Sequence, residues 1–232
     1  MLRMKIILPF FVMIQIMLGA GTVIGLSYVI EEIDTLTALF FATGGPSLTL
    51  LGIGLALLPQ LIAADKEQGI LEYMWSLPLP RVIYLLADLL IWTIATLPGL
   101  ILALLIATWY YGFELQINLL IIPGFLLVAS TATLIGYSIA YLSPKAQITS
   151  VITNLIIYSL FLFSPINYPI ERLPLFLQSV HKVLPVYYMS DIVRGNLTQI
   201  TLDNGMWLSF LVVSIWFVVS FMITLITINK RT

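Results

Sequence analysis

The amino-acid sequence predicts an all-α polytopic membrane protein with six transmembrane helices, a short cytoplasmic helix and re-entrant helices on the outer side. The first observation is composition: 60% of the 232 residues are hydrophobic and 9% are charged, whereas a soluble domain carries about 25% charged residues. So much apolar material also excludes intrinsic disorder. The second observation is six apolar stretches of about 20 residues, the length that a spanning helix needs. The third is that no alternating pattern of a membrane β-barrel occurs, which leaves helices to satisfy the backbone in lipid.

Each predicted span is a continuous apolar stretch with few charges. The stretches are 6–29, 38–62, 83–109, 117–141, 148–166 and 207–228. The second contains Gly44-Gly45-Pro46 and Pro59, which predict a kink or a late helix start. The third and fourth contain Pro98-Gly99 and Pro123-Gly124, residues that are more frequent in membrane helices than in soluble ones. We predict a single transmembrane domain over residues 1–232, surrounded by the lipid bilayer.

The basic residues predict that both termini lie in the cytoplasm. One set of connections between the spans carries seven of the ten Lys and Arg residues, and the opposite set carries three. Because cytoplasmic loops are enriched in Lys and Arg, the first set is assigned to the cytoplasm. The connections between the six spans then alternate between the two sides of the membrane, which is consistent with the count of six. We therefore predict a multi-pass protein of the plasma membrane. The seven residues are Arg3, Lys5, Lys66, Arg81, Lys145, Lys230 and Arg231.

The cytoplasmic segment 63–82 is predicted to contain an amphipathic helix. Apolar and polar residues alternate on a helical period from Ile70 to Leu77, and Pro78 and Pro80 end the pattern. Such a helix either lies flat at the membrane interface or places its apolar face in a groove of a cytoplasmic partner. Both interpretations stay open from the residues alone.

The outer segment 164–206 is predicted to contain two short helices. Its apolar pieces at 173–183 and 186–194 are too short to span, so we expect re-entrant or interfacial helices, with Gly195 as the C-cap of the second. The alternative is a structured loop that does no more than close the bundle.

The sequence offers little catalytic or metal-binding chemistry. It has no Cys, no Gly-Lys dipeptide of a phosphate-binding loop, and one His, His181, which we expect to be solvated or interfacial. We therefore predict no catalytic residue, no metal site and no cofactor bound by this chain. The lack of a basic patch argues against nucleic-acid binding.

Three polar residues within predicted spans are candidates for a substrate path: Asp88, Tyr137 and Asn154. A charge inside the membrane is costly. Near the cytoplasmic interface, Asp88 is therefore expected either to snorkel or to pair with Ser or Thr, or else to contact a substrate or proton on the entry side. Tyr137 and Asn154 either line a path or hydrogen-bond across helices. Gly21 and Gly25 form a small-xxx-small pair that permits close packing within one subunit or between two.

The two loop segments resemble those of type-2 ATP-binding-cassette exporter permeases. The first motif is DKEQGILE at 65–72, followed by SLPLPR at 76–81. The second is SPINYPIERLP at 164–174, followed by LPVYY at 184–188 and DIVR at 191–194. The resemblance covers nearly the whole chain in the number and order of spans.

The resemblance implies a complex of two permeases and two separate cytoplasmic ATPase subunits, which would hold ATP and Mg. Segment 63–82 would be a coupling helix seated in a groove of the ATPase, and the outer helices would close the exit. The residues of the implied coupling region are Glu67, Gly69, Leu71, Glu72, Pro78 and Arg81. The residues of the implied outer gate are Pro169, Glu171, Pro174, Pro185, Tyr187, Asp191 and Arg194.

We therefore predict a permease homodimer that exports a hydrophobic or amphipathic substrate, of drug, lipid or glycolipid type, by alternating access. An alternative within the same machinery is a haem-exporter-like permease of cytochrome maturation, which shares the Leu-Pro-Leu-Pro ending of the first loop. A third hypothesis is an ion-driven carrier or channel without an ATPase, for which Asp88 would be essential.

Overall fold

The computed structural model describes residues 2–29, 35–76, 78–112, 118–198 and 205–229. This part of the chain is helical and contains no strand, which confirms the all-α prediction. Six helical stretches in it are long and apolar enough to cross a membrane. They are Pro9–Tyr28, Thr35–Glu67, Arg81–Tyr111, Ile121–Leu142, Ala146–Phe163 and Met206–Asn229, close to the predicted spans.

Several spans are built from more than one helical element. The first contains α1 (Leu2–Ala20), the π-helical turn η1 (Gly21–Gly25) and α2 (Leu26–Val29), and the second contains α3 (Thr35–Gly52), η2 (Ile53–Leu57) and α4 (Leu58–Glu67). The third contains α6 (Arg81–Ala95) and α7 (Leu97–Tyr111). The remaining spans are α8 (Ile121–Leu142), α9 (Ala146–Phe163) and α12 (Met206–Asn229).

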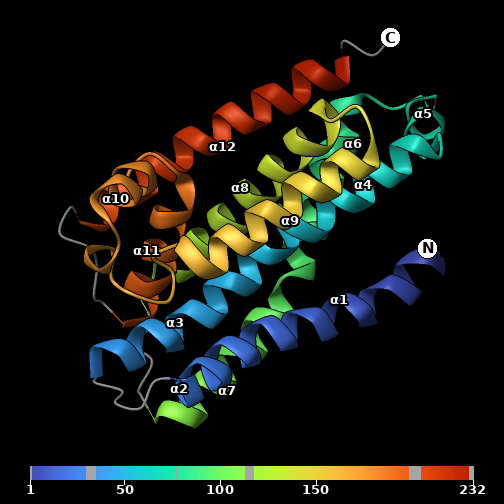
Figure 1. Cartoon of the computed structure of the whole chain (residues 1–232). Coiled ribbons are helices and arrows are strands. Elements are labelled where there is room, and N and C mark those ends of the chain that lie inside the picture. The colour runs from blue at the N-terminus through green and yellow to red at the C-terminus, as the bar shows by residue number, and fades with distance from the viewer. Residues whose placement is uncertain (1, 30–34, 77, 113–117, 199–204, 230–232) are drawn as a thin grey trace.

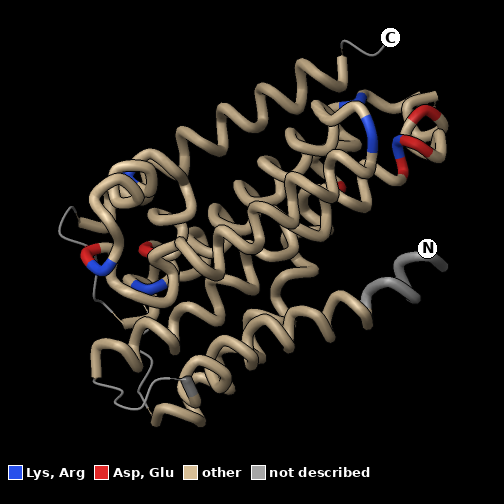
Figure 2. The backbone as a smooth tube through the Cα atoms, viewed as in Figure 1, with Lys and Arg blue, Asp and Glu red and all other residues tan. Residues whose placement is uncertain are grey.

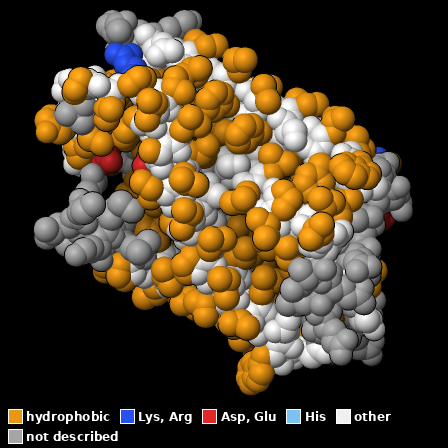
Figure 3. Space-filling model, turned by 180° about the vertical axis from the view of Figure 1, so that it is seen from behind, with side chains coloured by type: hydrophobic (Ala, Val, Ile, Leu, Met, Phe, Trp, Pro, Cys, Tyr) orange, Lys and Arg blue, Asp and Glu red, His pale blue; other side chains and the backbone are white. Residues whose placement is uncertain are grey.

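The elongated bundle has two distinct ends (Figure 1). The start of α1, the end of α12 and the short helix α5 (Ile70–Trp75) lie at one end. At the opposite end lie η3 (Ile170–Arg172), α10 (Leu175–His181) and α11 (Pro185–Thr198). Charged residues gather near these two ends, with the middle of the bundle nearly free of them (Figure 2). Hydrophobic side chains cover most of the face seen in Figure 3, as a surface in contact with lipid requires.

The predicted irregularity of the second span lies at η2, immediately before Pro59. Proline has no N–H to donate to the preceding turn, so an irregular turn there gives up a backbone hydrogen bond that would be missing in any case. α3 continues through Pro46 without a break. A close approach explains the glycines at η2: a Cβ on Gly136 of α8 would lie 2.0 Å from the carbonyl oxygen of Gly54. The second and fourth spans therefore touch backbone to backbone.

The core lies between the second span, α8 and α11, whereas α9 and α12 lie at the periphery. In the second span, 78% of the spanning window is buried inside the chain, against 17% in α9 and 22% in α12. Glycines of the first span divide in the same way. A Cβ on Gly19 would lie 2.7 Å from the Cβ of Ala103, while Gly21 and Gly25 have no neighbour within 4 Å. The predicted Gly21–Gly25 pair is therefore not used for packing within this chain.

Both predicted short helices of the 164–206 segment are present as α10 and α11. The prediction that Gly195 ends the second one is wrong, because α11 continues to Thr198 and every residue of it is buried. Asn196 and Thr198 donate side-chain hydrogen bonds to the carbonyls of Ile192 and Arg194, one turn back, so these buried donors have partners inside the core. Residues 199–204 lie outside the described part of the chain, as do Leu77, Lys230 and Arg231.

Candidate functional site

The 63–82 segment folds back on the adjoining helix ends through α5. Gly69 begins the turn with φ 72°, a conformation that glycine adopts without strain. Leu71 is buried at 1% exposure and belongs to the same hydrophobic cluster as Leu58 and Tyr137, which fixes α5 to the bundle. The opposite face is free: Glu72 is exposed, and Tyr73 is 67% exposed. This confirms the predicted amphipathic helix over Ile70–Trp75.

Lys66 and Glu67, at the end of α4, contact the turn between α8 and α9. The Lys66 ammonium donates to the carbonyl oxygens of Ser143 and Tyr141, which lie at the C-terminal end of α8. The Glu67 carboxylate accepts a hydrogen bond of 2.7 Å from the backbone N–H of Ala146, the first residue of α9. Because free carbonyls end a helix and free N–H groups begin one, each charge meets a helix end of opposite polarity.

Arg81 ties the same segment to the last span. Its guanidinium donates to the carbonyl oxygen of Ile228 over 2.7 Å, in the last turn of α12, and lies 5.4 Å from the centroid of the Trp75 ring. The Trp75 ring in turn packs against Tyr141 with a centroid distance of 6.3 Å. The C-terminal end of α5 is thus held by α6, α8 and α12 together.

The six residues that the sequence assigned to this region therefore divide into two groups. Glu67, Leu71 and Arg81 hold the segment in place, whereas Gly69, Glu72 and Pro78 are exposed. Leu79 joins the exposed group at 58% exposure. Lys66 was missed as a candidate, although its position inside the motif and next to Glu67 could have indicated it.

The structure brings Asp88 and Tyr137 together and leaves Asn154 apart. The Tyr137 hydroxyl donates to the Asp88 carboxylate, and the Trp92 side chain hydrogen-bonds to the same carboxylate. The Tyr137 ring is fully buried and stacks on Tyr141 at 5.8 Å between centroids. Asn154 is exposed on α9, in the middle of a spanning helix.

A buried arginine organises the opposite end of the bundle. Arg194 of α11 is 3% exposed and donates to the carbonyl oxygen of Ile166 over 2.9 Å and to the Thr43 hydroxyl of α3 over 3.3 Å. Its guanidinium lies 3.8 Å from the centroid of the Phe40 ring, a cation–π contact. Burial lowers the pKa of Arg194 to about 10, and the charge of Asp191 opposes this shift. The guanidinium therefore stays protonated at neutral pH.

Asp191 and Tyr187 belong to the same buried unit. The Asp191 carboxylate is fully buried and accepts a hydrogen bond of 2.5 Å from the Ser209 hydroxyl of α12. Burial and the nearby Asp191 charge raise the pKa of Tyr187 to about 12, so this phenol is neutral. α11 is thus joined by polar contacts to α3, to α12 and to the chain that follows α9.

The seven residues predicted for this region also separate. Pro185, Tyr187, Asp191 and Arg194 are buried in α11, whereas Glu171 and Pro174 are exposed and Pro169 is half-buried. The partners Phe40 and Thr43 were missed, because nothing in the local sequence marks an apolar-span residue as the partner of an arginine about 150 positions away. Ser209, which donates to Asp191, was missed as well.

Of the two environments expected for His181, solvated or interfacial, the solvated one is wrong. The side chain is 6% exposed, at the end of α10, and burial lowers the pKa of its imidazole. Among the described residues, no group of three His, Asp or Glu side chains could hold a metal ion.

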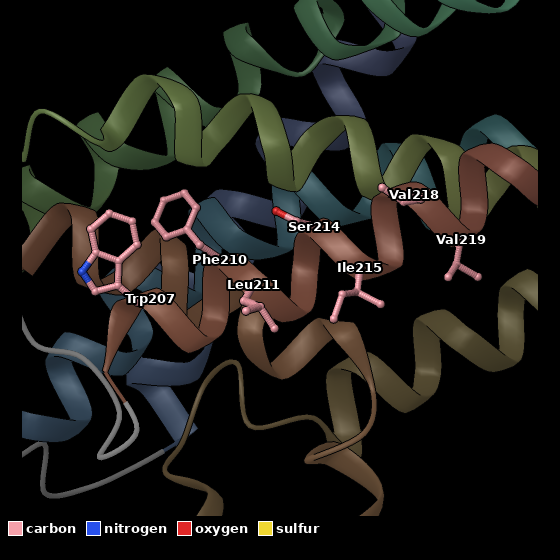
Figure 4. A pocket seen from close by; sticks show the side chains of 7 residues that line it. All are labelled: Trp207, Phe210, Leu211, Ser214, Ile215, Val218 and Val219. Carbon is pink, nitrogen blue, oxygen red and sulfur yellow. The ribbon is translucent and has the colours of Figure 1, made fainter.

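Several apolar hollows lie on the bundle. One of about 600 Å³ lies along the outer face of α12, where Trp207, Leu211 and Ile215 point away from the bundle (Figure 4). Ser214 is the single polar residue of its lining, so this face fits acyl chains rather than a polar ligand. A second, of about 90 Å³, lies between α1, the second span and α9, with Leu18, Gly52 and Leu160 in its lining.

The family model described as ABC-2 type transporter matches residues 1–198. No curated protein and no solved structure matches the chain.

Proposed function

Since the chain belongs to the ABC-2 type transporter family, it is a permease component, and we propose that it forms the membrane path of an ATP-driven exporter. Family membership implies an ATP-binding-cassette ATPase as partner. We propose that this separate subunit binds Mg and ATP and hydrolyses ATP, and that the permease alternates between two accessible states. We also propose the plasma membrane as location, with both termini in the cytoplasm, on the distribution of Lys and Arg.

The observation that carries the proposal is the exposed face of an anchored α5. A six-residue helix is far below the length at which isolated helices are stable, yet α5 is fixed by Leu71, Trp75 and Arg81. The face that remains free presents Glu72 and Tyr73 beside Leu79. An aromatic, an aliphatic and one charged group on a rigid projection suit a partner groove. A freely floating interfacial helix would need none of these anchors.

A second copy of the chain is the proposed partner within the membrane. α9 buries 17% of its spanning window and exposes Asn154 at mid-span. A polar amide in hydrocarbon is unfavourable without a partner, and helix association supplies one. Gly21 and Gly25, where an added Cβ would meet no atom within 4 Å, leave room for the close approach of another helix. We propose that α9 faces the second copy and that Asn154 lies beside the substrate path between them.

The substrate that fits this path is hydrophobic or amphipathic, of drug, lipid or glycolipid type. The exposed face of α9 supports this choice, because Val151, Leu155 and Tyr158, which lie within about one turn of Asn154, are 60–63% exposed. Asp88, already bonded to Tyr137, serves on this proposal to join α6 to α8. Family membership favours an ATPase-dependent mechanism over the ion-driven carrier.

Co-purification of the chain, expressed together with its neighbouring genes, tests whether it binds an ATPase. Glu72→Arg is expected to reduce ATPase recovery at least tenfold, because it reverses the charge on the free face of α5. The matched control is Glu171→Arg, which reverses an exposed glutamate at the opposite end and should leave recovery unchanged. Failure of the unsubstituted chain to bind any ATPase, or equal recovery for both variants, would overturn the proposal.

A further inference from the structure

The start of α9 is joined to α4 rather than to the rest of the bundle. α9 buries little of its surface, and two polar contacts link it to α4. One is the Glu67 carboxylate on the Ala146 N–H at 2.7 Å, and the other is the Gln60 amide donating to the Thr153 hydroxyl at 2.9 Å. A helix with few packing partners follows the element to which it is bonded.

α4 and α5 form a continuous hydrogen-bonded unit. The N–H of Gly69 donates to the carbonyl of Lys66 at 3.3 Å, and the carbonyl of Gly69 in turn accepts from the N–H of Tyr73 at 3.1 Å, so Gly69 links the end of α4 to α5. Glu67 also lies close along the chain to Glu72 on the free face of α5. A displacement of α5 is therefore expected to move the last turn of α4 with it.

We propose that Lys66 and Glu67 are positioning residues that transmit the movement of α5 to α9. Lys66 donates to the end of α8 and Glu67 accepts from the beginning of α9, so the pair contacts both ends of the turn between the two spans. When the ATPase displaces α5, Glu67 moves the start of α9, and with it the face that carries Asn154. This inference rests on the proposed function, because the movement originates in the ATPase.

Ala146→Pro breaks the central contact without touching α4 or α5. Proline lacks the N–H that Glu67 accepts, and the first helical position, which Ala146 occupies, is the one that suits proline. The residue before proline must be extended, and Lys145 already has φ −140° and ψ 151°. The variant is therefore expected to fold normally, whereas Glu67→Ala removes the same bond from the other side.

The test uses a fluorophore on α9 in the complex of permease and ATPase. Because the chain has no Cys, Val151→Cys gives a single attachment point at a position that is 60% exposed. The emission shift between the nucleotide-free and the ATP–vanadate-trapped complex reports the movement of α9. Ala146→Pro and Glu67→Ala are each expected to reduce this shift at least fivefold, and the double variant to reduce it no further. Glu67→Gln, which keeps the acceptor oxygen, should restore most of it.

Each outcome separates this inference from the proposed function. A full shift in Ala146→Pro, with the ATPase bound in normal amount, would overturn the transmission role and leave the permease assignment intact. Additive losses in the double variant would also overturn it, because the two changes would then act on different contacts. If the unsubstituted chain binds no ATPase, both proposals fail.

Discussion

Replacement of Arg194 by methionine should be among the most damaging single substitutions in this protein. Methionine fills much of the space of the arginine stem but cannot donate to Ile166 or Thr43 and carries no charge to place on the Phe40 ring. It also leaves the buried Asp191 carboxylate with the Ser209 hydroxyl but without the nearby cation. The substitution therefore removes hydrogen bonds and charge compensation together.

The expected cost follows from the burial of both charges. Removing one member of a buried charge pair costs about 3–5 kcal/mol, because the remaining charge stays buried. The charge-assisted hydrogen bond to Ile166 alone accounts for about 1.5–3 kcal/mol of this cost. For a chain of this size, each 1 kcal/mol lowers the melting temperature by about 2–4 °C. Arg194→Met should therefore melt roughly 6–20 °C below the unsubstituted protein.

Thermal unfolding in detergent, followed by tryptophan fluorescence, measures this shift. Arg172→Met is the matched control, because Arg172 is an exposed arginine of the same segment and its replacement should change stability by no more than about 0.5 kcal/mol. Adding Asp191→Asn to Arg194→Met removes the uncompensated charge and should raise the melting temperature again. Equal melting temperatures for Arg194→Met and Arg172→Met would refute the role assigned to the buried arginine.

Three further predictions concern other buried or exposed polar groups. Burial lowers the pKa of His181 below its ordinary 6.5, so the unfolded chain binds the proton at a higher pH than the folded one. Stability should therefore be constant above about pH 7.5 and fall below pH 6.5. His181→Gln should make the melting temperature independent of pH between 7.5 and 5.5, and an unchanged slope would contradict the assignment. Tyr137→Phe should lower the free energy of unfolding by about 1–3 kcal/mol, because it removes a hydrogen-bond donor from the Asp88 carboxylate. Asp88→Asn keeps an acceptor and should melt closer to the unsubstituted protein. A lower melting temperature for Asp88→Asn than for Tyr137→Phe would argue against the pair. Asn154→Cys should cross-link two copies under mild oxidation in membranes. The control Ile215→Cys, at a position 54% exposed on the face of α12 in Figure 4, should run as a monomer on gels. Equal cross-linking of the two variants would remove the support for α9 as the interface.

The spans could be predicted from the sequence because their cause is local. A run of about 20 apolar residues forms a membrane helix whatever its neighbours are, and the prolines and charges that end each run are part of the same stretch. The two loop segments could be placed for the same reason, since charges and prolines concentrate in them. Even the irregular turn near Pro59 follows from a property of that one residue.

The contacts of the candidate site could not be predicted, because their partners are set by how the helices pack. Glu67 meets an N–H 79 positions away, and Arg194 meets a hydroxyl 151 positions away. Neither partner is distinctive in sequence: Ala146 contributes only its backbone, and Thr43 is one of many hydroxyls in the spans. Gly195 was misplaced for a related reason. A glycine near the end of an apolar piece usually ends a helix, but here α11 continues through Gly195, and the side chains of Asn196 and Thr198 find acceptors one turn back within the core.

The two ends of the bundle differ in how easily their polar contacts can be exchanged. Glu67 is exposed, so water can replace the N–H of Ala146 at small cost, and a contact of this kind suits an element that is displaced in each cycle. Arg194 and Asp191 are buried, and separating their contacts would leave charges without partners. We therefore expect α11 and the start of the second span, joined through Thr43 and Phe40, to move together as one body when the exit opens. On the proposed function, a displacement of α5 would thus change the polar contacts of Glu67 at the same end of the bundle. At the opposite end it would move α11 and the start of the second span as a rigid body.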